Sequence, residues 1–456
     1  MDNTWFEVSP SEICWLSAAG FILLSGFALL RAWTQRRPFG AVVGLHANIF
    51  LFHGLGLATY LAAPGVDSPE VRLRVMSAIP SVSGPLLVGY AIATYFGSSR
   101  HGRTGLPGRS AFLNPIRIEW LVVLTVLSML GYWGSRFELA NSGAGTIFPV
   151  LKTLQYPCLL LATATARLDG WSFAVWLVCA GFSLITGWFT GWRSELVLLV
   201  TSIALGAVLR WPKRISLIAT AGIVSMLFVL PLANLKKANY EEVSQDPLAA
   251  IESVLGIPIL ERLSFFTEFW AIRVNAEREI GFMQAAVDGG ILELQQGKTF
   301  TDGLLQMIPR AVWTSKPIYN SFYGYTVPRV IGLVHSDDTG TSNAVNVYAE
   351  FIFNFRPFHL IWGVPLIFWL AGKMDGHATK LRNATVRDAY LLSLFFLLLQ
   401  VTSIVNTTTY LLWATVLAKL ADPIGGADAR SFHRREGRRW PTQQRDLFVG
   451  SNRVAR

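Results

Sequence analysis

Two cations are grouped with prolines and aromatic rings in the stretch "IPRAVWTSKPIYNSFYGY", residues 308–325. Arg310 and Lys316 lie six residues apart there, with Trp313 between them and a proline beside each. Proline restricts the backbone, and tryptophan and tyrosine are enriched where a membrane meets water. Such a stiff segment could hold both cations at one depth, which would suit a phosphate carried on a lipid. An aromatic belt with solvated cations is the alternative.

A further arginine, Arg193, falls in the short segment "TGWFTGWRSELVLL" between two apolar runs. A guanidinium group presents its donors as a fork that matches phosphate oxygens, so Arg193 could contact an anion at the membrane surface. The alternative is an arginine whose stem lies along apolar surface, or one that pairs locally with Glu195.

Residues 319–350 are rich in hydrogen-bonding groups and flat rings, a mixture that suits sugars. The candidates for substrate binding in and around this segment are Lys316, Trp313, Tyr319, Tyr323, Arg329, Asn343 and, earlier in the chain, Arg273. Glu350 and, after it, His335 are the candidates for a general base that takes a proton from a hydroxyl group. The alternative for both is a residue that only holds the chain through hydrogen bonds.

The familiar motifs of soluble enzymes are absent from the sequence, including a phosphate-binding glycine loop, HExxH, paired CxxC and G-x-S-x-G. Adjacent acids in "SDDTG", residues 336–340, could bind a divalent metal through oxygen ligands. A solvated turn is the alternative there, because Asp and Gly are common turn residues.

Ionisable residues within the apolar runs are few. His46 and His53 lie seven residues apart and therefore on one face of a helix, and Arg136 and Lys152 lie near the ends of other runs. Buried titratable groups in membrane spans are functional candidates by default. The sequence shows no chain of carboxylates across the spans, which argues against a secondary transporter.

The elements that must position these residues are membrane helices. Of the 456 residues, 52% are hydrophobic and 15% are charged, whereas soluble domains carry about 25% charged residues. A helix needs about 20 apolar residues to cross a bilayer, and the sequence has about eleven such stretches. Their centres lie near residues 22, 52, 86, 126, 156, 180, 202, 224, 365, 396 and 414. The predicted fold is an all-α polytopic membrane protein.

The distribution of positive charge predicts the orientation. With the N-terminus outside, about 24 of the 39 Lys and Arg residues fall on the cytoplasmic side and about four lie in short outer loops. We therefore expect the N-terminus outside and the C-terminus inside. The net charge of +10 could suggest a nucleic-acid partner, but this distribution argues against one, and we expect the basic tail to contact anionic lipid headgroups. The acidic segment "MDNTWFEVSPSE" before the first run is not typical of a cleavable signal peptide, so we expect a permanent first span.

Four regions follow from this pattern. Residues 1–234 form a bundle of about eight spans, and residues 235–357 form a long outer loop in which helical periodicity indicates surface helices. Residues 358–421 hold about three more spans, and residues 422–456 form a basic cytoplasmic tail. Cys14, Cys158 and Cys179 fall inside apolar runs without an evident disulfide partner, and we interpret them as small core residues.

Three segments together resemble the Wzy-type O-antigen or oligosaccharide repeat-unit polymerases. These are "GWRSELVLL" in a short outer hairpin, "GKTFTDGLLQMIPRAVWTSKP" in the long loop, and "TSNAVNVYAEFIFNF" before the last spans. The Pro-Arg-x-x-Trp-x-x-Lys-Pro core is the most specific part, and the similarity covers about residues 170–370. The sequence differs in "NFRPFHLIWG", where that family more often has a glycine-rich turn after Asn-Phe.

The resemblance implies a glycosyltransferase of the GT-C-like kind at the outer face of the bacterial inner membrane. Its donor would be a glycan on undecaprenyl diphosphate, its acceptor a lipid-linked repeat unit, and no metal, cofactor or nucleotide sugar is expected. Arg193, Arg310 and Lys316 match the basic residues of the family. A chain-length regulator and a flippase are the protein partners that such a pathway implies. An O-antigen ligase and a lipid-linked oligosaccharide flippase or transporter are the alternatives.

Overall fold

The computed structural model describes most of the chain as helices joined by short connections. The described residues are 9–35, 39–63, 65–101, 118–136, 147–165, 173–174, 176–183, 193–238, 247–273, 275–306, 308, 313, 315, 326–332, 346–399, 407–408 and 410–423. Within these residues every regular element is a helix and no strand occurs. The predicted all-α class is therefore confirmed for this part of the chain.

Three of the described helices are long and apolar enough to cross a membrane, namely Pro10–Thr34, Ala41–Ala62 and Pro69–Phe96. They coincide with the first three predicted spans and indicate a membrane-associated protein. Shorter apolar helices cover Glu119–Gly134, Val197–Arg210 and Ile215–Pro231. The total of eleven spans and the GT-C-like arrangement stay predictions.

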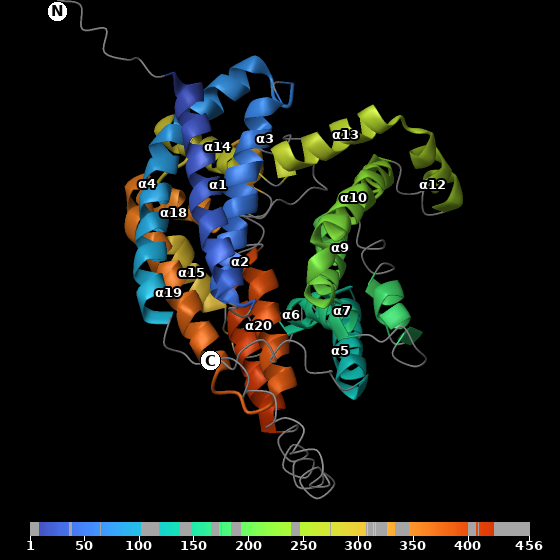
Figure 1. The fold of residues 1–456 in the computed structure, drawn as a ribbon. Helices are drawn as coiled ribbons and strands as arrows, with labels where there is room; N and C mark the ends of the chain where they lie inside the picture. Colours follow the sequence, from blue (N-terminus) through green and yellow to red (C-terminus); the bar gives the residue numbers. More distant parts are fainter. Residues whose placement is uncertain are drawn as a thin grey trace, which may run out of the picture.

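The first helices form one group (Figure 1). α1 is Pro10–Thr34 and α4 is Pro69–His101. Between them, α2 (Ala41–Asn48), the π-helix η1 (Ile49–Leu55) and α3 (Gly56–Ala62) follow one another without a break. Pro80 lies inside α4 and lacks the N–H that would bond to the carbonyl of Met76. The thiol of Cys14 lies 3.6 Å from that carbonyl and donates to it, which ties α1 to α4.

A second group of helices lies beside the first (Figure 1). Its elements are α5 (Ile118–Arg136), α6 (Ile147–Thr153), α7 (Gln155–Thr165), α9 (Arg193–Arg210), the short 3-10 helix η3 (Pro212–Arg214) and α10 (Ile215–Ala238). α7 packs against α9, and α9 packs against α10. A separate hydrophobic core formed mainly by α5, α7, α9 and α20 holds this group together.

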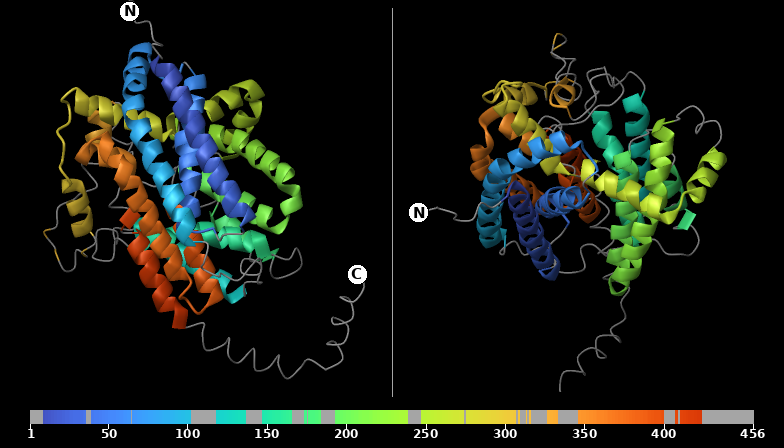
Figure 2. Two further views of the ribbon diagram at one scale, coloured as in Figure 1. Left: turned by 60° about the vertical axis from the view of Figure 1, so that its left-hand side comes forward. Right: turned by 90° about the horizontal axis from the view of Figure 1, so that it is seen from above.

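The segment predicted to form the outer loop is mainly helical in its described part, apart from short turns such as residues 289–297. Its elements are α12 (Pro247–Gly256), α13 (Ile259–Glu268), the π-helix η4 (Phe269–Arg273), α14 (Ala276–Asp288), α15 (Lys298–Gln306), α17 (Val327–Val330) and α18 (Val347–Phe355). α12 and α13 pack against α10, whereas α14 packs against α4, α3 and α18. In Figures 1 and 2, α14 lies at the end of the first group where α1 begins, and α20 lies toward the opposite end.

The last described helices return to the first group. They are η6 (Pro357–His359), α19 (Leu360–Ala378), α20 (Ala384–Leu399) and a helical stretch over residues 410–423. α19 packs along α4 and α20 packs along α2. Arg356 ends α18 with a φ of 71°, a backbone conformation that glycine adopts more easily.

A close approach fixes α14 in the bundle. A Cβ atom at Gly281 would lie 2.8 Å from Cγ1 and 3.1 Å from the carbonyl oxygen of Val75 in α4. Only glycine fits that spacing. Nine of the thirteen residues of α14 are buried, so this helix is part of the core rather than a cover on its surface.

Candidate functional site

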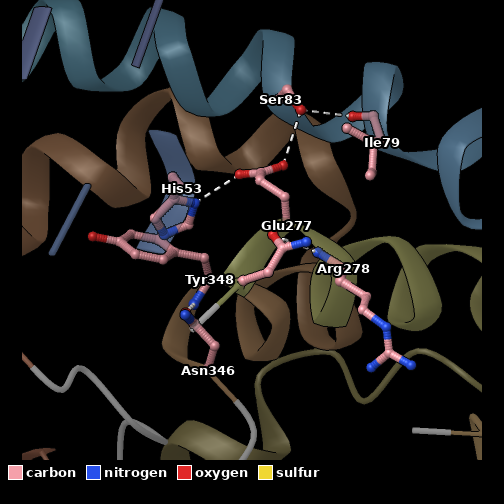
Figure 3. A network of polar contacts seen from close by, with 8 residues as sticks. His53, Ile79, Ser83, Glu277, Arg278, Asn346 and Tyr348 are labelled. Atoms are coloured by element: carbon pink, nitrogen blue, oxygen red, sulfur yellow. Dashed lines mark hydrogen bonds and ion pairs between the residues drawn. The ribbon is translucent and has the colours of Figure 1, made fainter. Parts of the chain in front are cut away.

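A buried group of polar side chains lies where α14 and α18 meet η1 and α4. Figure 3 shows its members, which are His53 of η1, Ser83 of α4, Glu277 of α14 and Tyr348 of α18. All four side chains belong to residues that are 0% exposed. Polar and charged groups that leave water are stable only if they find partners inside the protein, so their contacts define the site.

The π-helix η1 carries His53 into the interior. π-Helical turns are rare and occur frequently at functional sites, and this one interrupts an apolar membrane helix. The centroid of the His53 ring lies 5.5 Å from that of Phe21 in α1 and 5.0 Å from that of Tyr348. In Figure 3 the Tyr348 ring lies on the side of the imidazole that faces away from Glu277. Aromatic rings from two helices therefore enclose His53, while its Nδ1 atom faces α14.

Glu277 reaches into the bundle from the first turn of α14. Asn275 caps this helix, because its side-chain oxygen accepts a hydrogen bond of 3.2 Å from the backbone N–H of Arg278. An acidic residue in the first turn is favoured by the helix dipole. Oε1 of Glu277 lies 2.6 Å from Nδ1 of His53. A short contact of this kind is typical of a donor bonded to an ionised acceptor.

Ser83 completes the carboxylate's surroundings. Its Oγ atom lies 2.9 Å from Oε2 of Glu277 and 3.0 Å from the backbone carbonyl of Ile79. The hydroxyl has one proton and can donate it to either acceptor. The two oxygens of Glu277 thus face groups from two different helices, which fixes the carboxylate between η1 and α4.

Two buried atoms of this cluster have no hydrogen-bond partner in the part of the chain that the structure describes. They are Nε2 of His53 and the hydroxyl of Tyr348. Because Glu277 accepts at Nδ1, a neutral His53 carries its proton on Nδ1 and a lone pair on Nε2. Histidines that bind a metal commonly donate one ring N–H to a carboxylate, which fixes the tautomer in this way.

A second contact ties α14 to the connection between α3 and α4. Nε and Nη2 of Arg278 donate to the two oxygens of Asp67 at 2.9 Å and 2.6 Å, and the hydroxyl of Tyr60 donates to Asp67 at 2.9 Å. Burial of the Asp67 carboxyl opposes its ionisation. The hydrogen bonds and charge of Arg278, with help from Tyr60 and Arg72, outweigh burial and lower the pKa of Asp67.

A third contact links α14 to α18. Oε1 of Glu279 accepts a hydrogen bond of 2.5 Å from the backbone N–H of Asn346, the residue that caps α18 through its side chain. Burial raises the pKa of Glu279 to about 7, although the bond from Asn346 and the charge of Arg278 both act in the opposite direction. Glu277 and Glu279 are two residues apart, yet one contacts the membrane helices and the other contacts α18.

Glu350 is the candidate base whose side chain lies in the described part of the chain. It lies in the first turn of α18, two residues after Tyr348, and is 0% exposed. Its backbone N–H donates to the carbonyl of Asn346 at 2.9 Å. Asn354 donates to the carbonyl of Glu350 at 2.7 Å. Glu350 is therefore a buried helical residue, not part of an open loop.

Other predicted residues are placed only in part. Trp313 is half-buried and its indole N–H donates to Oγ of Ser315 at 3.1 Å. Arg329 lies in α17 and is half-buried. Arg193 is the first residue of α9 and Arg273 the last of η4. The side chains of these two arginines, together with Arg310, His335, Lys316, Tyr319, Tyr323 and Asn343, lie outside the described part of the chain. The anion contacts expected of Arg193 and Arg310 thus stay predictions.

Glu277 was missed in the sequence, although a signal for it exists. Ala276, Ile280 and Gly281 lie on one face of α14 and are buried, and helical spacing puts Glu277 on this same face. A carboxyl group on the buried face of a helix needs a hydrogen-bond or ionic partner inside the protein. The sequence identifies His53 as a titratable residue within a span. It does not identify the partner of His53, because the carboxylate of Glu277 comes from α14, outside the predicted spans.

The three cysteines are buried and not joined by disulfides, which confirms their interpretation as small core residues. Sγ of Cys158 and Sγ of Cys179 lie 4.0 Å apart, and Oγ1 of Thr125 lies 3.3 Å and 2.9 Å from them. The thiols of Cys158 and Cys179 are thus neighbours within the core. No group of three or more His, Cys, Asp or Glu side chains among the described residues could hold a metal ion. The SDDTG segment lies outside those residues.

Comparison with known proteins does not identify a family. No protein-family model matches the chain, and neither a curated protein nor a solved structure does. The functional argument therefore depends on the residues and their geometry.

Proposed function

We propose that the protein is a polysaccharide polymerase, a glycosyltransferase that acts at the outer face of the bacterial inner membrane. It transfers a glycan from an undecaprenyl-diphosphate-linked donor to a lipid-linked repeat unit. The resemblance of residues 170–370 to the Wzy-type polymerases supports this assignment. The three apolar helices that could cross a membrane support the location in a membrane.

The structural observation that carries the proposal is the insertion of α14 and α18 into the bundle. Both helices come from the segment to which the resemblance assigns the active site. α14 lies at the end of the bundle where α1 begins (Figure 1), which is the outer end if the N-terminus is outside. α18 carries Glu350, the predicted base, in the same turn as Tyr348, whose ring contacts His53.

The proposed reaction needs one base and a set of cations. The Glu350 carboxylate takes the proton of the acceptor hydroxyl, whose oxygen forms a bond to the donor sugar. The bond between that sugar and the diphosphate breaks, and the lipid diphosphate leaves with the bonding electrons. Arg193 and Arg310 stabilise the negative charge that grows on the leaving group, and Lys316 holds the diphosphate. Because Glu350 is fully buried, the acceptor reaches it only after α18 or its surroundings move.

A second candidate function is a lipid-linked oligosaccharide flippase or another transporter. The observation that favours it is the contact between His53 and Glu277, because paired ionisable groups inside a membrane bundle are typical of transport pathways. A transporter would need His53 and Glu277 but would not need Glu350 as a base.

The test is the length of the surface glycan in a strain that lacks the protein and receives a plasmid-borne variant. We expect deletion, Arg310→Ala and Glu350→Gln each to reduce the glycan ladder to one repeat unit on its acceptor. Glu261→Gln, an exposed acid of α13, is the matched control and should restore the full ladder.

The other outcomes separate the alternatives. Long polymer that accumulates on undecaprenyl diphosphate would identify a ligase. Loss of all glycan from the outer face, with repeat units retained inside, would identify a flippase. An unchanged ladder in the deletion strain would contradict all three assignments.

A further inference from the structure

Continuous contacts lead from His53 in a membrane helix to Glu350 in α18. One route passes through α18 itself, because the rings of His53 and Tyr348 lie edge to face with an interplanar angle of 80°, and Tyr348 and Glu350 belong to the same first turn of α18. The other route passes through α14. Each step of this second route is a hydrogen bond or a stretch of rigid helix.

The first step is the contact between His53 and Glu277. Both residues are fully buried, and Nδ1 lies 2.6 Å from Oε1. Removing one partner of such a pair leaves the other without its hydrogen bond in a region that water does not reach. The orientation of Glu277, and of the α14 turn that carries it, therefore depends on His53.

The second step is α14 itself. Asn275 caps its first turn, and Arg278 ties the same turn to Asp67. Glu277 and Glu279 belong to this turn, and their side chains leave the helix in different directions. A displacement of Glu277 is therefore passed to Glu279 through rigid helical backbone.

The third step is the start of α18. Glu279 accepts from the backbone N–H of Asn346. The side chain of Asn346 accepts from the N–H of Tyr348 at 2.8 Å, and its carbonyl accepts from the N–H of Glu350 at 2.9 Å. Asn346 thus holds the first turn of α18, where Glu350 lies, and Glu279 holds Asn346.

We propose that His53 and Glu277 are positioning residues that fix Glu350 for glycan transfer. His53 acts through two contacts, one with Tyr348 and one with Glu277 and α14. The inference rests on the proposed function, since Glu350 is the base of that reaction. It adds a residue of an early membrane span to a site that the sequence places in the long loop.

The chain contains a matched control for His53. His46 lies seven residues earlier in the same apolar helix and is also buried. Its Nδ1 atom lies 2.7 Å from the hydroxyl of Tyr90, so it has a comparable hydrogen bond. That bond connects α2 to α4 and does not involve α14. A general loss of packing should affect both histidine positions alike.

The experiment compares His53→Leu, His53→Asn and His46→Leu in the full-length protein purified in lipid nanodiscs. Asparagine and leucine have similar shapes, but the asparagine amide can donate to Glu277 from nearly the position of Nδ1. Amide hydrogen exchange of residues 346–355 reports the order of α18. Polymerisation of lipid-linked repeat units, prepared from the deletion strain, reports turnover and KM.

We expect His53→Leu to speed exchange of residues 346–355 by about tenfold or more, because a buried carboxylate loses its partner. Turnover should fall by a similar factor with KM unchanged, since residue 53 does not contact the substrate. His53→Asn should restore both values, and His46→Leu should leave both as in the wild type. Glu277→Gln provides a second variant if His53→Leu does not fold, and it should show the same pattern more weakly.

Three results would overturn the inference. Equal effects of His53→Leu and His46→Leu would show a general loss of packing. Faster exchange with normal turnover would show that the contacts order α18 but do not position Glu350 for catalysis. Failure of His53→Asn to restore activity would mean that His53 itself carries a proton. If wild-type protein makes no polymer while exchange still depends on His53, the proposed function fails and the structural coupling stands.

Discussion

At the scale of single residues, the acids of α14 show how position decides chemistry. Glu277 shares its carboxylate oxygens between His53 and Ser83. Glu279 has a hydrogen bond from Asn346, but burial raises its pKa from the ordinary value of 4.5 to about 7. Burial favours the neutral form of an acid because water no longer stabilises the charge. Glu279 is thus an acid whose charge changes near neutral pH.

The raised pKa of Glu279 predicts that stability falls as pH rises. Below about pH 4.5 the acid is protonated in both the folded and unfolded states. Between about 4.5 and 7 the unfolded state releases the proton while the folded state keeps it, so the free energy of unfolding decreases, and above about 7 it levels off. The total loss should be about 3 kcal/mol. Thermal unfolding of purified protein at pH 5 and pH 8 measures it.

A neutral residue at the same position isolates this effect. Glu279→Gln keeps an acceptor for Asn346 but cannot ionise, so the difference between pH 5 and pH 8 should shrink. Glu293→Gln, at an exposed acid, should leave that difference as in the wild type. The assignment to Glu279 fails if both variants retain the same pH dependence.

At the scale of secondary structure, the position of α14 depends on close contact with α4. The helix approaches Val75 so closely that a Cβ atom at Gly281 would overlap it. The Asn275 cap and the pair of Arg278 with Asp67 fix its first turn. Together these features hold an amphipathic helix inside the bundle, where its acids meet membrane helices.

Gly281→Val should displace α14 from α4. The added side chain has no space, and overpacking of this kind costs about 1–3 kcal/mol. We expect a lower unfolding temperature and faster amide exchange in residues 276–288 and 346–355. Gly84→Val is the control, because nothing lies within 4 Å of a Cβ atom at Gly84 in α4. Equal exchange in the two variants would argue that the contact with Val75 does not hold α14 in place.

At the scale of the whole molecule, the charge pattern and the arrangement of helices together predict how the protein is oriented in the membrane. The basic segments predict the N-terminus outside, and α14 lies at the same end of the bundle as the start of α1 (Figures 1 and 2). Residues between α19 and α20 lie toward the other end. α14 should therefore enter the bundle from the outer side, and its Glu277 reaches His53 and Ser83 near the middle of the second and third spans.

Cysteine labelling in intact cells tests this orientation. The three native cysteines are buried, so introduced ones can be distinguished after native cysteines are replaced by alanine. Asp288→Cys, at the exposed end of α14, should react with a membrane-impermeant maleimide from outside. Lys380→Cys, exposed between α19 and α20, should react only after the membrane is opened. The reverse pattern would place α14 on the cytoplasmic side.

Much of the architecture is encoded locally. Long apolar runs predict the first three spans, and helical periodicity predicts the amphipathic helices of the long segment, because both follow from the preferences of neighbouring residues. Glu350 was selected as the candidate base from its type and its sequence surroundings. The roles of Arg193 and Arg310 depend on family resemblance and stay predictions.

The sequence by itself predicted a helical membrane protein with amphipathic helices in residues 235–357, α14 among them. Only the tertiary structure decided that this helix enters the bundle and that Glu277 meets His53 across 224 residues of sequence. The physical reason is that helical periodicity shows which face of α14 must be buried but not what it is buried against. That partner depends on the shape of the whole bundle, where glycine at position 281 leaves space for α14 beside α4.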